Sequence, residues 1–197
     1  MKHLKALNTH VTDDALKALR EADLLHLLPG PAGKEEKRKP TNADEVTKVD
    51  LWYTSVTGAG LKDLAPLRNL ETLKLSREQV TDEGLKSLLE AGQLQAWLNS
   101  KVGRDEGGRP AQGVRTLLEV TELDLSHTQV GDAGLRELAV LENLSRLSLF
   151  DAPVTDEGIK VLARLKRLAW ISLRGTRVTD RVARWLRKAL PGCAIMR

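Results

Sequence analysis

The chain has 197 residues, of which 41% are apolar and only 3% aromatic, so any core it forms is almost entirely aliphatic. Its single cysteine excludes an intramolecular disulfide and a cysteine-rich zinc site. No apolar run approaches the roughly 18 residues that span a membrane. The net charge of +4 hides an uneven distribution, because residues 164–197 contain ten Lys or Arg and one acid. The first residues lack the apolar stretch of a secretory signal, so we expect a soluble cytoplasmic protein.

Apolar residues recur along the whole chain at a nearly constant spacing. Successive members lie 24, 21, 24, 24, 26, 24, 24 and 24 residues apart. Such a period is typical of stacked repeats, in which each unit buries its apolar side only against its neighbours. The nine positions, which we expect to be core anchors, are Leu4, Leu28, Val49, Leu73, Trp97, Leu123, Leu147, Ile171 and Ile195.

In chain order, the pattern predicts a first strand near Leu4 without an N-terminal cap. That first repeat is therefore exposed or paired with a second copy of the chain, so self-association is possible there. Regular strands follow around Val49 and Leu73, then around Leu123, Leu147 and Ile171, and a short closing strand is expected at 193–196. Cys193 in that last segment is expected to be structural and partly buried.

Two units depart from the regular pattern in the same way. Residues 18–28 align with residues 87–97, and each leads into a Gly-, Pro- and charge-rich stretch, at about 29–45 and 99–113. The match indicates duplication of a larger module, in which a helix is partly replaced by a loop. Such loops either grip a partner or are neutral, tolerated insertions.

The stretch Val120–Leu144 contains one complete repeat. Leu123 and Leu125 alternate with polar residues, as in a short strand. A Thr follows, whose hydroxyl can satisfy loop backbone groups, and corresponding residues are Thr9, Thr54, Thr128 and Thr176. Thr-Asp pairs come next at 12–13, 81–82, 155–156 and 179–180, where Thr suits a helix N-cap and Asp the positive helix end. Leucines three apart then predict a short amphipathic helix.

This pattern resembles the leucine-rich repeat family, and specifically its 24-residue bacterial subclass with a Thr-x-Val-Thr-Asp-x-Gly-Leu signature. The signature is most complete at Val80–Leu85 and Val154–Ile159, although both segments lack its leading Thr. The resemblance implies an α/β fold: a single right-handed solenoid over 1–197, with parallel strands on the concave face and short helices on the convex face. Members of the family are mostly interaction modules, so a protein-binding role is expected rather than an enzymatic one.

The concave face is the expected site of partner binding. Strand side chains alternate, so the residues beside each anchor point away from the core. Four of the six aromatic residues fall there or at its rim, and aromatic and Arg side chains are the commonest binding anchors. The alternative is that they pack against neighbouring side chains or loops. The predicted partner-binding residues are Trp52, Tyr53, Lys74, Asp124, His127, Arg146, Phe150, Trp170 and Arg174.

A second hypothesis involves the basic C-terminal end. Arg181, Arg184 and Lys188 share one face of the last predicted helix, and Arg177 precedes it. These cations could bind an anionic polymer such as nucleic acid, or simply form a solvated cap of the repeats. No phosphate-binding loop, nucleophile motif or metal-ligand spacing is present in the sequence, so neither a cofactor nor a metal is expected.

Overall fold

The computed structural model describes residues 11–30, 39–101 and 116–197. The chain divides into two compact units. The N-terminal unit comprises Met1–Gln79 and Lys86–Gly113, and the C-terminal unit comprises Val80–Leu85 and Val114–Arg197. Helix α3 (Asp82–Glu90) contributes residues to both.

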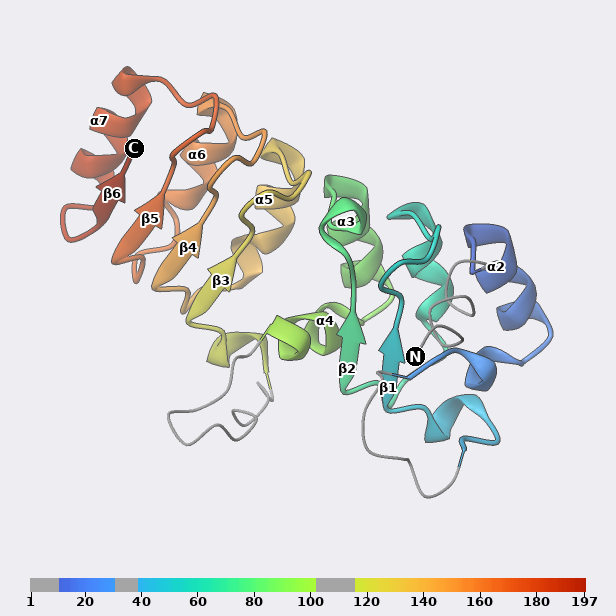
Figure 1. Ribbon diagram of the computed structural model, residues 1–197. Helices are drawn as coiled ribbons and strands as arrows, with labels where there is room; N and C mark the ends of the chain where they lie inside the picture. The colour runs from blue at the N-terminus through green and yellow to red at the C-terminus, as the bar shows by residue number, and fades with distance from the viewer. Residues whose placement is uncertain (1–10, 31–38, 102–115) are drawn as a thin grey trace, which may run out of the picture. The chain divides into compact units, whose positions relative to one another are not determined.

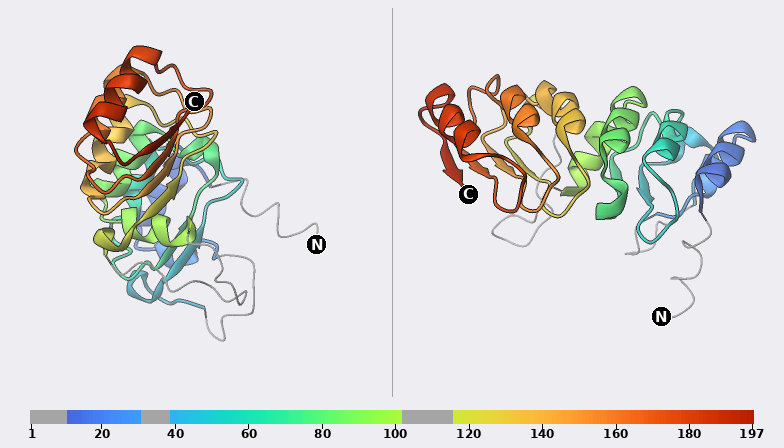
Figure 2. Two further views of the ribbon diagram at one scale, coloured as in Figure 1. Left: turned by 90° about the vertical axis from the view of Figure 1, so that its left-hand side faces the viewer. Right: turned by 90° about the horizontal axis from the view of Figure 1, so that it is seen from above.

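The C-terminal unit has the regular architecture that the repeat predicts (Figure 1). Its four strands form one parallel sheet in chain order, and their central residues Leu123, Leu147, Ile171 and Ile195 pair in register. One helix follows each of the first three strands, and Figure 2 shows these helices along one side of the sheet. The elements are η5 (Leu117–Glu119), β3 (Glu122–Asp124), α5 (Asp132–Glu137), η6 (Leu138–Val140), β4 (Arg146–Ser148), α6 (Asp156–Leu162), β5 (Trp170–Ser172), α7 (Asp180–Ala189) and β6 (Ala194–Met196).

The N-terminal unit is less regular. Two parallel strands, β1 (Lys48–Asp50) and β2 (Thr72–Lys74), pair with Val49 opposite Leu73. Helix α4 packs against β2, and α2 packs against η3. The remaining elements are α2 (Asp13–Glu21), η1 (Leu25–Leu27), η2 (Ala43–Glu45), η3 (Ala59–Leu64), η4 (Arg77–Gln79) and α4 (Leu94–Lys101).

The recurring apolar residues form the core, as the spacing predicts. Every predicted anchor that the structure describes is buried; the ninth, Leu4, lies outside the described residues, as does the proposed self-association through the first repeat. The predicted loop Thr residues that the structure describes have the predicted role, whereas Thr9 lies outside the described residues. The hydroxyls of Thr54, Thr128 and Thr176 donate to the carbonyls of Leu51, Leu125 and Leu173 at 2.6–2.7 Å.

The Thr-Asp pair has two functions, of which the sequence indicated one. Thr12, Thr81, Thr155 and Thr179 accept helix N–H groups, as predicted for N-caps. The Asp lies in the first turn of its own helix, as predicted, but its carboxylate also bonds the next repeat of its own unit. The Asp132 carboxylate accepts the N–H and the hydroxyl of Thr155 at 2.8 and 2.5 Å. The same link joins Asp13 to Thr57 and Asp156 to Thr179, and Asp82 accepts the N–H groups of Gly131 and Gly134.

This link also explains the Gly of the signature. A Cβ on Gly134 would lie 2.6 Å from the Oδ1 of Asp82, and a Cβ on Gly158 would overlap the Oδ1 of Asp132. The carboxylate of one repeat therefore occupies the space beside the glycine of the next, and the signature describes a contact between repeats.

The two degenerate units lack their strands, because Leu28 follows the η1 turn and Trp97 lies within α4. The helices that precede these positions, α2 and α3, have nine residues each. Much of the stretches 29–45 and 99–113, where a loop was predicted to replace part of a helix, lies outside the described residues. Helix α4 also extends to Lys101, beyond the predicted start of irregular structure at 99. Consequently the described strands form two sheets, β1–β2 and β3–β6, and no strand of the described residues joins them through Trp97.

The similarity between the degenerate units extends to their backbone. Both helices end in a residue of positive φ, Asp23 at 58° and Gly92 at 70°. The next N–H donates back to the preceding turn in both, from Leu24 to Leu19 at 2.7 Å and from Gln93 to Leu88 at 2.8 Å. Corresponding residues are 69 positions apart throughout, as in the predicted alignment.

The C-terminal segment closes the sheet as predicted, with β6 pairing to β5. Cys193 immediately before it is buried, and burial raises the pKa of its thiol. Both observations agree with a structural role for this cysteine.

Candidate partner-binding surface

The strand face is the surface formed by the side chains that flank the buried anchors of the strands, on the side away from the helices. In the N-terminal unit it presents Trp52 and Tyr53, which follow β1 after the buried Leu51. Their side chains are 48% and 64% exposed, and their ring centroids lie 5.2 Å apart. This unit therefore exposes a pair of large aromatic rings to solvent.

Asp50 anchors the backbone at the start of this pair. Its carboxylate is almost buried, accepts the N–H of Trp52 at 3.0 Å and lies 3.6 Å from the ammonium of Lys74. Lys74 is thus the counter-ion of Asp50 and remains partly exposed. The sequence prediction included Lys74 but not Asp50, whose signal was its position two residues before an exposed aromatic.

In the C-terminal unit, Arg146 connects two neighbouring strands of the same face. Its guanidinium lies 4.9 Å from the ring centroid of Trp170 and 3.7 Å from the Glu122 carboxylate. These three residues stand opposite one another in the strand register. Trp170 is half-buried and Arg146 is exposed, so the guanidinium of Arg146 covers part of the Trp170 ring at the surface of these strands.

A second cluster lies where the same strands end. His127 meets Phe150 edge-on, with ring centroids 4.9 Å apart, and its Nδ1 lies 3.3 Å from the Asp151 carboxylate. Phe150 is half-buried, whereas His127 and Asp151 are exposed. Nearby, the hydroxyls of Ser126 and Ser148 are 2.8 Å apart, a contact that the sequence analysis missed.

One backbone position produces this rim in both units. Four residues after the strand anchor, Tyr53, His127, Asp151 and Gly175 all have positive φ, between 54° and 72°. A left-handed residue at this point turns the chain from strand into loop, and non-glycine residues rarely adopt it without a reason. The sequence analysis predicted Tyr53 and His127 as partner-binding residues, but it gave no sign of the conformation that they share with Asp151 and Gly175.

The remaining predicted residues are exposed but less constrained. Asp124 accepts the N–H of Ser126 at 2.9 Å, and Arg174 is exposed at the end of β5. Within the described ranges neither side chain has an ion-pair partner. Both charges are therefore available on the strand face.

The cations of the second hypothesis are also exposed. Arg177 precedes α7, and Arg181, Arg184 and Lys188 stand on it. None of these four forms an ion pair with another described residue. Among residues 11–30, 39–101 and 116–197, no helix is both long and apolar enough to cross a bilayer.

The leucine-rich repeat family model matches residues 67–89, 120–139 and 140–163. Among solved structures, a leucine-rich repeat protein of Leptospira interrogans matches with 18% sequence identity and a TM-score of 0.41. The match covers 89% of this chain and 44% of that protein, so the chain spans less than half of its length. At this score the likeness carries no argument about function. Comparison with curated proteins gave no match.

Proposed function

We propose that this chain, a leucine-rich repeat protein with parallel strands and short helices, is a non-enzymatic module that binds a protein partner on its strand face. Leucine-rich repeats generally mediate protein–protein interactions and typically serve as scaffolds rather than as catalysts. In this proposal Trp52, Tyr53, Phe150 and Trp170 are the aromatic anchors. The charges that complement the partner come from Lys74, Asp124, His127, Arg146 and Arg174, and the protein acts in the cytoplasm.

The exposed pair Trp52 and Tyr53 is the observation that carries the proposal. Aromatic side chains dominate core and interface energetics, and Trp and Tyr are the most frequent residues at binding hot spots. The Asp50 carboxylate anchors the backbone of Trp52, and the two rings lie next to each other. An exposed aromatic pair is the kind of anchor that interface cores contain.

The charges of the strand face support a protein partner over a nucleic acid. Lys74 is paired with Asp50 and Arg146 with Glu122, while Asp124 adds an unpaired carboxylate. A phosphate backbone would require a largely basic track, because its affinity comes from cations that replace counterions. A balanced surface of both signs instead favours specificity for a complementary protein surface.

The proposal is tested with two matched tryptophan substitutions. Trp52 and Trp185 are similarly exposed, at 48% and 42%, but Trp185 lies on helix α7 rather than on the strand face. After affinity capture identifies a partner, calorimetry should show that Trp52→Ala weakens binding by about 30-fold or more, as expected for a hot spot worth at least ~2 kcal/mol. Trp185→Ala should leave the affinity within about twofold.

Phe150→Ala extends this test to the C-terminal unit. Circular dichroism and the urea midpoint establish that each variant is folded. Unchanged affinity of folded Trp52→Ala and Phe150→Ala proteins would remove the strand face as the binding site. Equal losses of affinity for Trp52→Ala and Trp185→Ala would also exclude the strand face as the binding site.

The second candidate is an adaptor for an anionic polymer, which the exposed, unpaired cations Arg177, Arg181, Arg184 and Lys188 favour. Replacing all four by Gln should abolish retention on a single-stranded oligonucleotide. Binding of the unmodified chain should weaken steeply between 50 and 200 mM salt, with a slope that reflects about 0.7 released counterions per contact on a single strand. Salt-independent binding would contradict phosphate contacts.

A further inference from the structure

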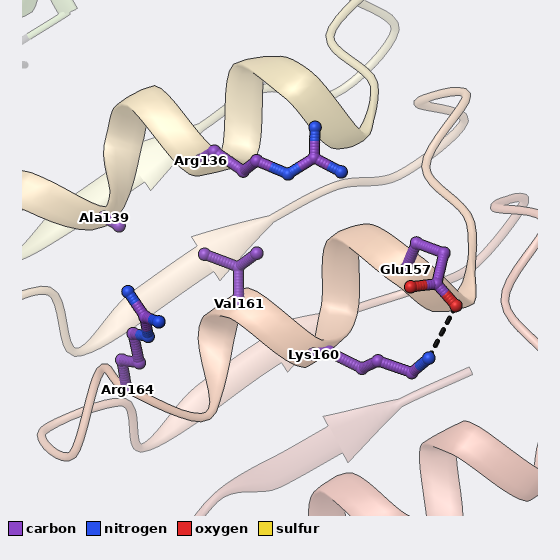
Figure 3. A pocket seen from close by; sticks show the side chains of 6 residues that line it. All are labelled: Arg136, Ala139, Glu157, Lys160, Val161 and Arg164. Carbon is purple, nitrogen blue, oxygen red and sulfur yellow. Dashed lines mark hydrogen bonds and ion pairs between the residues drawn. The ribbon is translucent and has the colours of Figure 1, made fainter.

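A groove lies between helices α5 and α6 on the side of the C-terminal unit away from its strand face (Figure 3). Its volume is about 420 Å³, within the range of small-ligand and peptide sites. The six residues that line it are Arg136, Ala139, Glu157, Lys160, Val161 and Arg164.

The groove has an apolar floor between cations. Val161 points into its middle from α6, and Ala139 lies on the opposite wall, while Arg136 and Arg164 extend toward different ends (Figure 3). Its one carboxylate, Glu157, is already engaged with the ammonium of Lys160 at 2.5 Å. Arg136 and Arg164 form no ion pair with any described side chain, so two guanidinium groups remain free.

The placement of these cations is systematic in the sequence. The residue four positions after the Asp of the Thr-Asp pair, or after the residue in its place, is basic and exposed in six helical segments, α2, η3, α3, α5, α6 and α7. These residues are Lys17, Lys62, Lys86, Arg136, Lys160 and Arg184. A cation in the last turn of a helix gains some stabilisation from the helix dipole. That effect accounts for Arg136 and Lys160, but it explains neither Arg164, which follows α6, nor the apolar floor between the two arginines.

We propose that this groove binds an acidic segment of a partner protein in an extended conformation. One aliphatic side chain of that segment covers Val161 and Ala139, and Asp or Glu carboxylates on either side pair with Arg136 and Arg164. A guanidinium presents a planar set of donors that matches a carboxylate, and such charge-assisted hydrogen bonds are about twice as strong as neutral ones.

The lining favours an acidic peptide over a nucleic acid. Glu157 adds a carboxylate to the wall, and Val161 offers an apolar surface that a sugar–phosphate backbone cannot use. This site is also separate from the strand face, because its residues come from α5, α6 and the turn after α6. Its occupation therefore does not depend on the function proposed above, and Trp52→Ala should leave it unchanged.

The test measures fluorescence polarisation of a labelled, end-capped synthetic peptide that has glutamates on both sides of two central leucines. With the full 197-residue chain at low salt, the peptide should bind saturably. Arg136→Gln and Arg164→Gln should each weaken binding by about tenfold, the loss expected for one hydrogen bond to a charged group. A second peptide with serines in place of the leucines should bind more weakly, since it cannot cover Val161.

Lys62→Gln is the matched control, because Lys62 is exposed at the equivalent position on η3 but does not line the groove. It should change the affinity by less than about twofold. A loss equal to that of Arg136→Gln would overturn the groove and indicate general attraction to a basic surface. The absence of saturable peptide binding would also overturn the proposal, as would a single-stranded oligonucleotide of equal charge binding more tightly through Arg136 and Arg164.

Discussion

The carboxylate link between repeats makes Asp132 an informative residue to replace. Asp132 begins α5 and accepts both the N–H and the hydroxyl of Thr155, which caps α6. Asp132→Ala removes both acceptors without introducing a new group. We expect the C-terminal unit to lose stability because two donors at the start of α6 lose their partner in the neighbouring repeat.

The size of the loss follows from the number and surroundings of these bonds. A hydrogen bond to a charged group contributes about 1.5–3 kcal/mol, and a half-buried site such as Asp132 belongs near the lower end, because water can replace part of the interaction. Two such bonds, with the smaller loss of a negative charge at the first turn of α5, give about 3 kcal/mol. For a chain of this length, that corresponds to a fall in Tm of roughly 6–12 °C.

Urea denaturation of a double-mutant cycle isolates the contact. Asp132→Ala, Thr155→Ala and the double variant should show a coupling free energy of about 1 kcal/mol, since Thr155→Ala removes the hydroxyl but keeps the backbone N–H. Glu142→Ala, an exposed acid with no partner among the described side chains, should change stability by less than about 0.5 kcal/mol. Additive effects of Asp132→Ala and Thr155→Ala would refute the link, as would an Asp132→Ala protein no less stable than the Glu142→Ala control.

Two further predictions concern the same carboxylate links between repeats. Gly158→Ala places a methyl group 3.1 Å from the Cα of Asp132 and onto its carboxylate, so it should cost about 1–3 kcal/mol in thermal denaturation. The cost should be smaller when Asp132 is already Ala, and an equal cost in both backgrounds would mean that the carboxylate does not fill this space. The backbone N–H of Thr179 lowers the pKa of Asp156 below its ordinary value, so the stabilisation from this carboxylate is complete above the unfolded pKa of about 3.9 and is lost as the pH falls through the lower folded pKa. The gap in urea midpoint between the unmodified chain and Asp156→Asn should therefore be constant above about pH 5 and close in stronger acid; a gap that persists at pH 2 would contradict this origin.

The sequence by itself determined the repeating core. A spacing near 24 residues identified the buried anchors from Leu28 to Ile195. Period two placed the strands around Val49, Leu73, Leu123, Leu147 and Ile171. The sequence correctly predicted that Thr54 donates to the loop backbone and that Thr155 caps a helix. Each of these hydrogen bonds joins residues no more than three positions apart. Local chemistry of this kind is readable from the chain alone.

Only the tertiary structure decided what depends on neighbouring repeats. Asp132 bonds a residue 23 positions away, and no local pattern distinguishes that partner from the first turn of its own helix. Trp97 matches the anchor spacing and is buried as expected, but it lies on helix α4 rather than on a strand. The spacing alone could not distinguish the two, because a buried large side chain satisfies it in either element.

The candidate surfaces divide in the same way. Exposure of Trp52 follows from strand alternation and was predictable, whereas the anchoring of its backbone by Asp50, the partner of Lys74, depends on the register between β1 and β2. The groove between α5 and α6 exists only because these two helices pack side by side, so that Arg136 and Arg164, 28 residues apart in the sequence, line the same space. Contacts within a repeat involve residues close together in the sequence and can be predicted from it, but contacts between repeats form only once the repeats have stacked.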